Sequence, residues 1–395
     1  MRSGGHPDGQ GAHRQSDYRE EIMVAADPRN PGTDGLTRLW VLPVPILGDE
    51  LISSWLARSA LTLGCDPLVL TGAIWPHWRV WTVDVDRAFP EDRLEALIRA
   101  CGIARARICK AGLEDVHQAI SCHIDQGIWP WLLAYGTRNR RHRGGLQYCP
   151  RCLGGNHIPY YRRAWRLAWH TGCAIHGETL RDGCPCCSAA IEPHLLTAQA
   201  IRLDRCASCG GDLRQAGRGP LQRGAFRFQQ LADEVVEVGC GRFGDQTMPS
   251  REWFALARFL IALLRRVSSG KSRGLRHFLT SLDVDPSDVD LPPVLQLPLE
   301  LLSTGERIQL LRPIAGLLEA GVDRFITAAR GARLTQASLH SVQPNVPIGL
   351  GPLVKSLPCS NYCRRHNSAR RPEFPRTPSA VLRQCRLMHR RLARR

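Results

Sequence analysis

The chain has 395 residues, of which 43% are apolar and 23% charged, and its formal net charge is +17. This length predicts two or three domains rather than one small core, and no run of eighteen apolar residues exists to cross a membrane. The N-terminal stretch has no apolar segment of the secretory type. We therefore expect a cytoplasmic protein whose sixteen cysteines stay reduced and bind metal rather than form disulfides.

The positive charge is unevenly distributed. Residues 359–395 contain eleven arginines and one acidic residue, Glu373, so they carry +10 and leave +7 for residues 1–358. A basic chain attracts polyanions, chiefly nucleic acid. The sequence leaves open whether this tail has a specific role or is a frayed end that inflates the total.

The N-terminal part begins without a structural pattern. Residues 1–38 are rich in glycine, proline and polar residues and are predicted to be disordered. Apolar residues then recur at helical spacing over about 49–63, with Asp49 placed as the N-cap and Gly64 as the stop signal.

Two further short helices are predicted before the cysteine-rich region. One covers residues 67–74, and the other covers about 90–100 and is followed by Gly102. Short helices separated by tight turns predict a helix-turn-helix-like domain over residues 39–137. A plain helical bundle is the alternative, because the sequence does not show which helix enters a DNA groove.

A helical domain is predicted over residues 216–340. Its first part, 216–250, is glycine-rich and read as irregular apart from a short helix at 229–238. A strong amphipathic helix starts with Ser250 as its N-cap, and two or three more helices follow before about residue 340. Residues 341–395 have no usable period and are predicted to be a basic, disordered tail.

The most informative feature is a set of paired metal-ligand residues within a predicted double zinc-binding region, 138–215. Four pairs, each with two intervening residues, recur along it: Cys149 and Cys152, Cys173 and His176, Cys184 and Cys187, Cys206 and Cys209. Two intervening residues let a tight turn aim both side chains at one ion, and a second such turn completes a tetrahedron. The spacing predicts two zinc ions per chain with sequential pairing. Interleaved pairing, and Cys186 in place of Cys187, stay open.

The same pattern argues against catalysis. Four thiolate or imidazole ligands leave no open position on an ion. The nearest match to a zinc deaminase, His123-Ile124-Asp125, has aspartate where glutamate is required. Nucleotide-binding, metalloprotease and nucleophile-elbow motifs are also missing. Asp84 and Asp86 are interpreted as turn residues, and we expect no catalytic residues and no enzyme activity.

Arginines lie close to the cysteine pairs. Between the first two pairs the spacing predicts a helix with an apolar face of Trp165 and Trp169 and a separate cationic face. Guanidinium groups suit phosphates, although an acidic protein surface is the alternative partner. The candidate contact residues are Arg140, Arg141 and Arg143 in the basic loop before the cysteines, and Arg162, Arg163 and Arg166 between them.

Several stretches resemble the TniQ family. "LPVPILGDELISSWLARSA" resembles the family's opening, and "YCPRCL…PYYRRAWRLAWHTGCAIHGETLRDGCPCC" resembles its central signature. "RCASCGGDL" is similar to the closing knuckle, and "RIQLLRPIAGLLEAGVDRF" to the helical segment that follows. The similarity spans about residues 39–340 and does not include the tail.

The resemblance implies a mainly α fold with small zinc-ribbon modules: a helix-turn-helix-like N-terminal domain, two central zinc knuckle pairs and a C-terminal helical domain. It implies a non-enzymatic adaptor of DNA transposition in the bacterial cytoplasm, associated with the nucleoid. Such an adaptor binds target DNA, or an RNA-guided complex at the target, and recruits an AAA+ ATPase and a DDE transposase. A homodimer stays open. The alternative is a zinc-finger transcription regulator with no transposition role.

Overall fold

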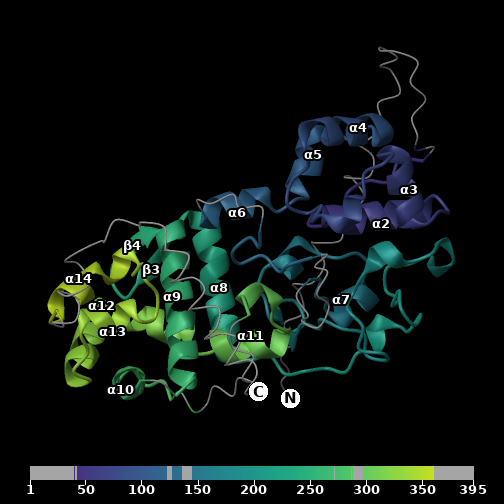
Figure 1. Ribbon diagram of the computed structural model, residues 1–395. Helices are drawn as coiled ribbons and strands as arrows, with labels where there is room; N and C mark the ends of the chain where they lie inside the picture. The colour runs from purple at the N-terminus through teal and green to yellow at the C-terminus, as the bar shows by residue number, and fades with distance from the viewer. Residues whose placement is uncertain are drawn as a thin grey trace, which may run out of the picture. The chain divides into compact units, whose positions relative to one another are not determined.

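The computed structural model describes residue 40 and residues 42–121, 127–135, 145–270, 272–285, 287 and 297–359. Over these residues the protein is mainly helical, as predicted, with two small antiparallel sheets of two strands each (Figure 1). None of the helices in this part of the chain combines the length and apolar character that crossing a bilayer requires. The segment predicted to be disordered at the N-terminus lies outside the described residues.

Five helices form the N-terminal part: α2 (Ile52–Thr62), α3 (Pro67–Ile74), α4 (Glu91–Cys101), α5 (Arg105–Lys110) and α6 (Glu114–Ile120). Helix α2 is buried along its whole length except for its last residue, because its apolar and small side chains face neighbours on every side. Helix α4 ends where Gly102 adopts a left-handed φ of 72°. The three helices predicted here are confirmed, but α2 begins at Ile52, and its N-cap is Leu51 rather than the predicted Asp49. The helix-turn-helix arrangement stays a prediction.

The cysteine-rich part is built from short elements: α7 (Pro150–Gly155), η2 (Arg163–Arg166), β1 (Gly172–Cys173), β2 (Glu178–Thr179), η3 (Pro193–Leu195), η4 (Ala198–Ala200) and η5 (Leu213–Gln215). Strands β1 and β2 pair antiparallel, with Cys173 opposite Glu178. Elements this short supply few backbone hydrogen bonds, so this part depends on side-chain interactions to hold its shape.

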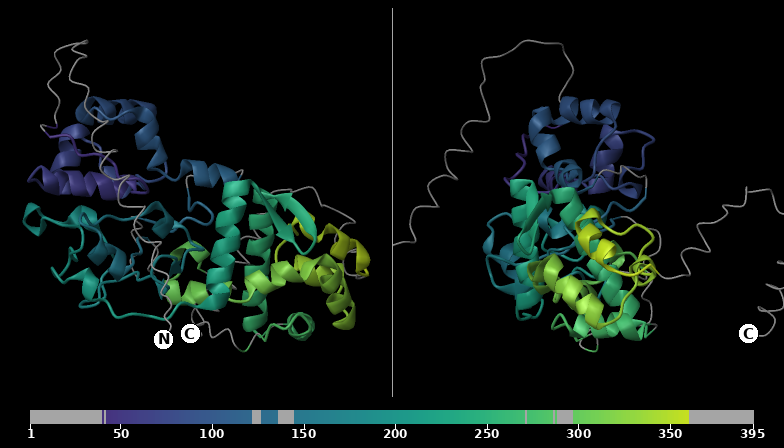
Figure 2. Two further views of the ribbon diagram at one scale, coloured as in Figure 1. Left: turned by 180° about the vertical axis from the view of Figure 1, so that it is seen from behind. Right: turned by 90° about the vertical axis from the view of Figure 1, so that its left-hand side faces the viewer.

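The C-terminal part contains the long helices. Its elements are α8 (Arg223–Val238), β3 (Cys240–Phe243), β4 (Gln246–Pro249), α9 (Ser250–Ser268), α10 (Arg273–Thr280), η7 (Leu299–Leu301), α11 (Thr304–Leu311), α12 (Ile314–Gly331), α13 (Gln336–His340), η8 (Ile348–Leu350) and α14 (Gly351–Ser356). Helices α8 and α9 lie side by side, and the β3–β4 hairpin connects them at one end (Figures 1 and 2).

Two glycines allow the hairpin to pack closely. A Cβ atom at Gly241 would lie 2.5 Å from the Trp253 ring of α9. A Cβ atom at Gly244 would lie 2.6 Å from the Cα of Gly321, where α12 kinks with a φ of 72°. The β3–β4 hairpin therefore packs so closely against α9 and α12 that any side chain larger than glycine's at these two positions would clash.

The structure corrects three predictions about this part. The segment read as irregular contains the full sixteen-residue α8 and the β3–β4 hairpin. The N-cap of α9 is Pro249, while the Ser250 hydroxyl donates a hydrogen bond to the Ala119 carbonyl at 2.5 Å. The predicted tail start at 341 is too early, because α14 follows and buries Leu353. Residues 360–395 lie outside the described residues.

Candidate metal centres and their surroundings

The first ligand set comes from two tight turns. Cys149 precedes α7 and Cys152 lies within it, while Cys173 ends β1 and His176 lies in the turn to β2. Gly177 closes that turn with a φ of 64° and donates its backbone N–H to the Cys173 carbonyl at 2.9 Å. The four ligand atoms all lie within 4.8 Å of one another.

The distances in this set suit a metal ion. His176 Nδ1 lies 3.4 Å from the Cys149 sulfur, 3.3 Å from the Cys152 sulfur and 3.5 Å from the Cys173 sulfur. The Cys152 and Cys173 sulfurs are 3.6 Å apart. Ligands at tetrahedral angles about 2.0–2.3 Å from zinc lie about 3.5–3.8 Å from one another. The first set therefore has the size of a tetrahedral zinc site.

The second set repeats this design with four sulfurs. Cys184 lies 3.6 Å from Cys209, and Cys187 lies 3.7 Å from Cys206. All four belong to one cluster, and Cys186 is outside it. The structure therefore groups the pairs sequentially rather than interleaved, and it places Cys187 rather than Cys186 among the ligands.

One thiol of each set has a lowered pKa. The pKa of Cys173 lies well below its usual value because the thiols of Cys149 and Cys152 hydrogen-bond to its sulfur. At Cys184 burial opposes ionisation, but backbone N–H groups and neighbouring thiols lower its pKa to about 7. The shared hydrogen bonds have the opposite effect on the other thiols of each set: the pKa is raised at Cys149 and Cys152, and at Cys206 and Cys209, so without an ion one thiol in each set ionises most readily.

The donor set also defines what each site can do. Thiolates and imidazole are the ligands that zinc prefers, and four protein ligands occupy all positions of a tetrahedral ion. Each site can therefore hold an ion in a structural role, joining two turns of a region that has little regular secondary structure of its own.

Arg166 was a candidate contact residue, and the structure places it in the core instead. Its side chain has no exposed surface, and its guanidinium pairs with Asp84 and Asp86, each at 2.5 Å. It also donates to the Leu133 carbonyl at 2.7 Å. Arg166 has no access to an external phosphate, so its role here is structural.

The other two arginines of this segment are also engaged. Arg162 pairs with Asp49 at 2.7 Å, and Arg163 pairs with Asp115 at 2.5 Å, with about a fifth of each arginine side chain exposed. The prediction of a helix with a cationic face between the first two cysteine pairs is wrong. The segment contains only the 3₁₀ turn η2. Arg140, Arg141 and Arg143 lie outside the described residues.

The buried charges were missed by sequence reasoning. Asp86 accepts hydrogen bonds from the backbone N–H of Ser53 at 2.8 Å and from its hydroxyl at 2.9 Å. Arg166 therefore joins helix α2, through Asp86, to the segment between the first two cysteine pairs. Burial raises the pKa of Asp86 to about 6, although the Arg166 charge acts in the opposite direction. No local motif signals this contact, since its partners are about eighty residues apart in sequence.

A second buried arginine joins the same segment to the C-terminal part. Arg307 of α11 donates to the carbonyls of Ala168 at 2.7 Å and His170 at 3.1 Å, and to the Gln147 side chain at 2.7 Å. Burial lowers the pKa of Arg307 to about 10, so it stays charged at neutral pH. His170 itself pairs with Asp233 of α8 at 2.7 Å.

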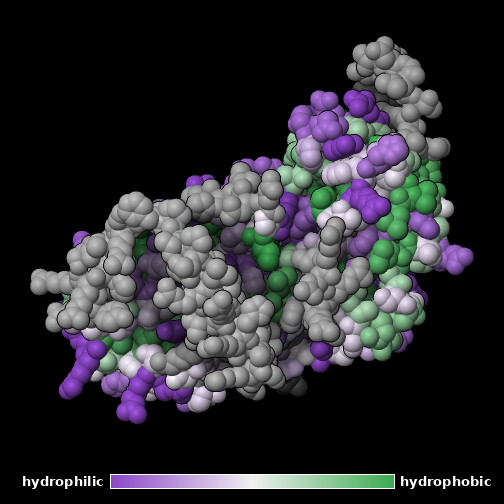
Figure 3. Space-filling model, in the orientation of Figure 1, coloured by the Kyte–Doolittle hydropathy of each residue, from purple (hydrophilic) through white to green (hydrophobic). Residues whose placement is uncertain are grey.

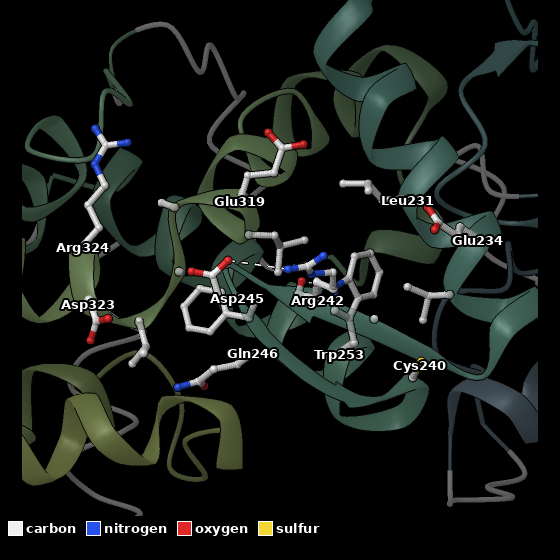
Figure 4. A pocket seen from close by; sticks show the side chains of 18 of the residues that line it. Leu231, Glu234, Cys240, Arg242, Asp245, Gln246, Trp253, Glu319, Asp323 and Arg324 are labelled. Carbon is white, nitrogen blue, oxygen red and sulfur yellow. Dashed lines mark hydrogen bonds and ion pairs between the residues drawn. The ribbon is translucent and has the colours of Figure 1, made fainter.

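A cavity of about 530 Å³ lies between α8, the β3–β4 hairpin and the kink in α12 (Figure 4). Charged side chains on its rim are paired with one another: Arg242 with Asp245 at 3.6 Å, and Arg227 with Glu319 at 3.1 Å. Among the described residues, the clusters that could hold a metal ion are the two cysteine sets, and neither contributes to this cavity.

Comparison with known proteins identifies part of the chain. Residues 42–180 match the family model described as TniQ. A search among curated proteins finds no match for the chain. The matched segment begins before α2 and ends after β2, so it contains the five N-terminal helices, the Arg166 ion pairs and the complete first ligand set.

Proposed function

Since residues 42–180 belong to the TniQ family, we propose that the protein is a non-enzymatic, DNA-binding adaptor of DNA transposition. The family match carries this proposal, because it implies a role associated with transposition. The adaptor selects or marks the target site, recruits an AAA+ ATPase regulator, and through it a DDE transposase. No catalytic residue is part of the proposal.

Both metals are proposed to be zinc, two per chain. Three thiolates with one imidazole, and four thiolates, are donor sets of structural zinc sites. Zinc bound there holds a region of short elements in one shape, so that its surface is presented as a rigid unit to DNA and to partner proteins. The first ligand set lies within the family match, and the second lies beyond it.

Binding of DNA is supported by the charge of the chain. The net charge of +17 favours polyanions through release of counterions from the phosphate backbone. Because the arginines between the first two cysteine pairs are held by carboxylates, the proposed contacts are made by other basic residues. Recruitment through an RNA-guided complex is a variant of the same role.

A reconstitution on immobilised DNA tests the proposal. The purified protein is incubated with a target duplex, an AAA+ ATPase regulator of DNA transposition, and ATP, and the retained ATPase is measured. We expect the ATPase to be retained several-fold more when the protein is present. Equal retention without the protein contradicts the adaptor role.

Two companion measurements separate the alternatives. Elemental analysis is expected to give two zinc ions per chain, and prolonged incubation with DNA is expected to leave the DNA chemically unchanged. Sequence-specific DNA binding that changes transcription without any effect on ATPase loading would instead favour a zinc-finger transcription regulator.

A further inference from the structure

Five arginines lie within or close to the ligand pairs of the two metal sets. Arg151 stands between Cys149 and Cys152, and Arg205 immediately precedes Cys206. The turns that place these ligands therefore also place arginine side chains. We call the five residues the knuckle arginine surface: Arg151, Arg202, Arg205, Arg214 and Arg218.

Three recessed carboxylates lie beneath these arginines. Arg151 and Arg218 approach Glu178 at 3.7 and 3.8 Å, and the other three arginines approach Asp204 or Asp212 at 2.7 to 3.9 Å. The arginine side chains are 37–76% exposed, whereas the carboxylate side chains are at most 12% exposed. Five guanidinium groups and three carboxylates leave a net charge of +2, and the positive groups form the outer layer.

Five exposed arginines elsewhere in the chain pair with acids that are themselves exposed. The acidic side chains are at least 52% exposed where they pair with Arg99, Arg105, Arg227, Arg242 and Arg324. At Arg162 and Arg163 the acid is again the more exposed partner. A carboxylate on the surface cancels the field of its arginine toward solvent, whereas a buried carboxylate leaves the guanidinium as the group that an approaching anion meets.

The five arginines form one continuous surface. Helix α7 packs against η5, and a Cβ atom at Gly154 would lie 3.8 Å from the Arg214 side chain. Arg151 lies three residues before Gly154, so it projects from the same side of α7. Shared carboxylates connect the remaining arginines to Arg151 and Arg214.

Three of the five arginines keep their N–H groups free. The carboxylate oxygens nearest to Arg151, Arg205 and Arg218 lie 3.7, 3.8 and 3.8 Å away, beyond hydrogen-bonding distance. These guanidinium groups donate to no acceptor among the described residues, and each offers five N–H donors in a planar fork. Such forks match phosphate oxygens in charge and in geometry.

The surroundings of these arginines suit a phosphate backbone better than a protein. The two stretches that carry them, 150–155 and 202–219, expose no large apolar side chain, and they expose glycines such as Gly210 and Gly217 that let a polymer approach closely. A stable protein interface needs an apolar core. Apolar surface of that kind lies instead on α3, where Leu68 and Val69 are 51% and 61% exposed and green side chains gather in Figure 3.

We propose that the knuckle arginine surface contacts the phosphate backbone of duplex DNA. This inference rests on the proposed DNA binding and adds where the contact is made. The surface includes arginines beside both ligand sets, so part of it lies beyond residues 42–180. Contacts of this kind position a protein on a duplex without reading its sequence.

Salt-dependent binding of the purified protein to a 30-base-pair duplex tests the inference. R205Q/R218Q removes two charges and leaves each buried carboxylate with an arginine: Arg202 stays 3.1 Å from Asp204, Arg214 stays 2.7 Å from Asp212, and Arg151 stays 3.7 Å from Glu178. The control R99Q/R227Q removes two charges from exposed arginines whose acids are exposed. R205K/R218K keeps both charges, and an unchanged zinc content verifies that each variant keeps its fold.

Each phosphate contact contributes about 0.9 to the slope of log K against log salt. We expect R205Q/R218Q to lower that slope by about 1 to 2 and to bind the duplex about tenfold or more weakly at 50 mM KCl. The control and R205K/R218K are expected to stay near the wild-type slope. If R205Q/R218Q loses zinc, R218Q alone is measured, because the Arg218 side chain is 76% exposed, and a decrease of about 0.9 is expected.

Different failures have different meanings. If the wild-type protein does not bind duplex at 50 mM KCl, the proposed DNA binding fails, and this inference fails with it. If the wild type binds and R205Q/R218Q keeps the same slope, or the control loses as much, the inference alone is overturned. Unchanged duplex binding together with lost retention of the AAA+ ATPase also overturns it, because the surface would then bind an acidic protein.

Discussion

Replacing Arg166 by methionine tests the reading of this arginine as a structural residue. The change removes the guanidinium that lies between Asp84 and Asp86 and keeps a side chain of similar length. Asp84 retains Arg87 at 3.2 Å, and Asp86 retains the two hydrogen bonds from Ser53. Asp86, which has no exposed surface, is then left as a buried carboxylate without a cation.

The expected loss is large. Removing one partner of a buried ion pair typically costs about 3–5 kcal/mol. A domain is stabilised by only about 5–15 kcal/mol, so the variant loses a substantial part of its stability. The control is R162M, which breaks the pair with the 46% exposed Asp49 and is expected to cost about 1 kcal/mol or less.

Urea unfolding at pH 7.5 in the presence of zinc measures both variants. The double variant R166M/D86N is expected to recover part of the loss, because it removes the orphaned charge. DNA binding at a temperature where R166M is folded is expected to equal that of the wild type. A stable R166M protein that no longer binds DNA would refute the structural reading and restore Arg166 as a contact residue.

Three further outcomes are expected. C187S should lower the zinc content from two ions to one per chain, whereas C186S should keep both, because Cys186 lies outside the ligand cluster; equal zinc content in both variants would contradict the assignment. R333G should raise the free energy of unfolding by about 0.5–1 kcal/mol, because glycine accepts a left-handed φ; a loss of stability would show that Arg333 is held by contacts instead. The raised pKa of Asp86, about 6, means that its carboxyl takes up a proton on folding between pH 3.8 and 6, so its contribution to stability is lost as pH rises through 6. Between pH 5 and 7 the wild type should therefore lose about 1 kcal/mol of stability relative to D86N, and parallel pH curves for the two proteins would contradict this.

The sequence correctly predicted the helices and ligand pairs that are determined by residues close to one another in the chain. Helix α3 begins and ends at the predicted residues, because proline fixes its first turn and its apolar run is short. Helix α4 stops at the glycine that was expected to stop it. The metal sets were found in the same way, since two residues between ligands specify a turn regardless of the rest of the fold.

Predictions failed where distant partners decide the structure. The spacing of Trp165 and Trp169 suggested an α-helix, but the backbone there bonds across to another segment. The Leu133 N–H donates to the Arg166 carbonyl, and the Ala168 N–H donates to the Trp131 carbonyl, both at 2.8 Å. These bonds replace the helical ones, so the two tryptophans are buried without sharing a helix face.

Contacts between residues far apart in sequence also explain why the arginines were assigned to a contact surface and why the tail was predicted to begin too early. Asp49 was expected to cap a helix, yet its carboxylate binds Arg162, which lies more than a hundred residues away in sequence. Helix α14 shows no helical period because it is one short turn, and it is held by the burial of Leu350, Leu353 and Leu357. No window of sequence contains both partners of such contacts.

The two buried arginines also indicate why the metal sites matter beyond their own region. Arg166 binds carboxylates contributed by the N-terminal part, and Arg307 of the C-terminal part binds carbonyls at Ala168 and His170. Both act on the one stretch that lies between the first two ligand pairs. Because Cys152 and Cys173 flank this stretch and share one proposed ion, the ion limits the positions that the stretch can adopt. A buried guanidinium tolerates little displacement before its hydrogen bonds are lost. Loss of the first metal should therefore weaken the hydrogen bonds of Arg166 and of Arg307 together, and with them the attachment of the N-terminal helices and of α11. Loss of the second metal should leave the stretch between Cys152 and Cys173 in place.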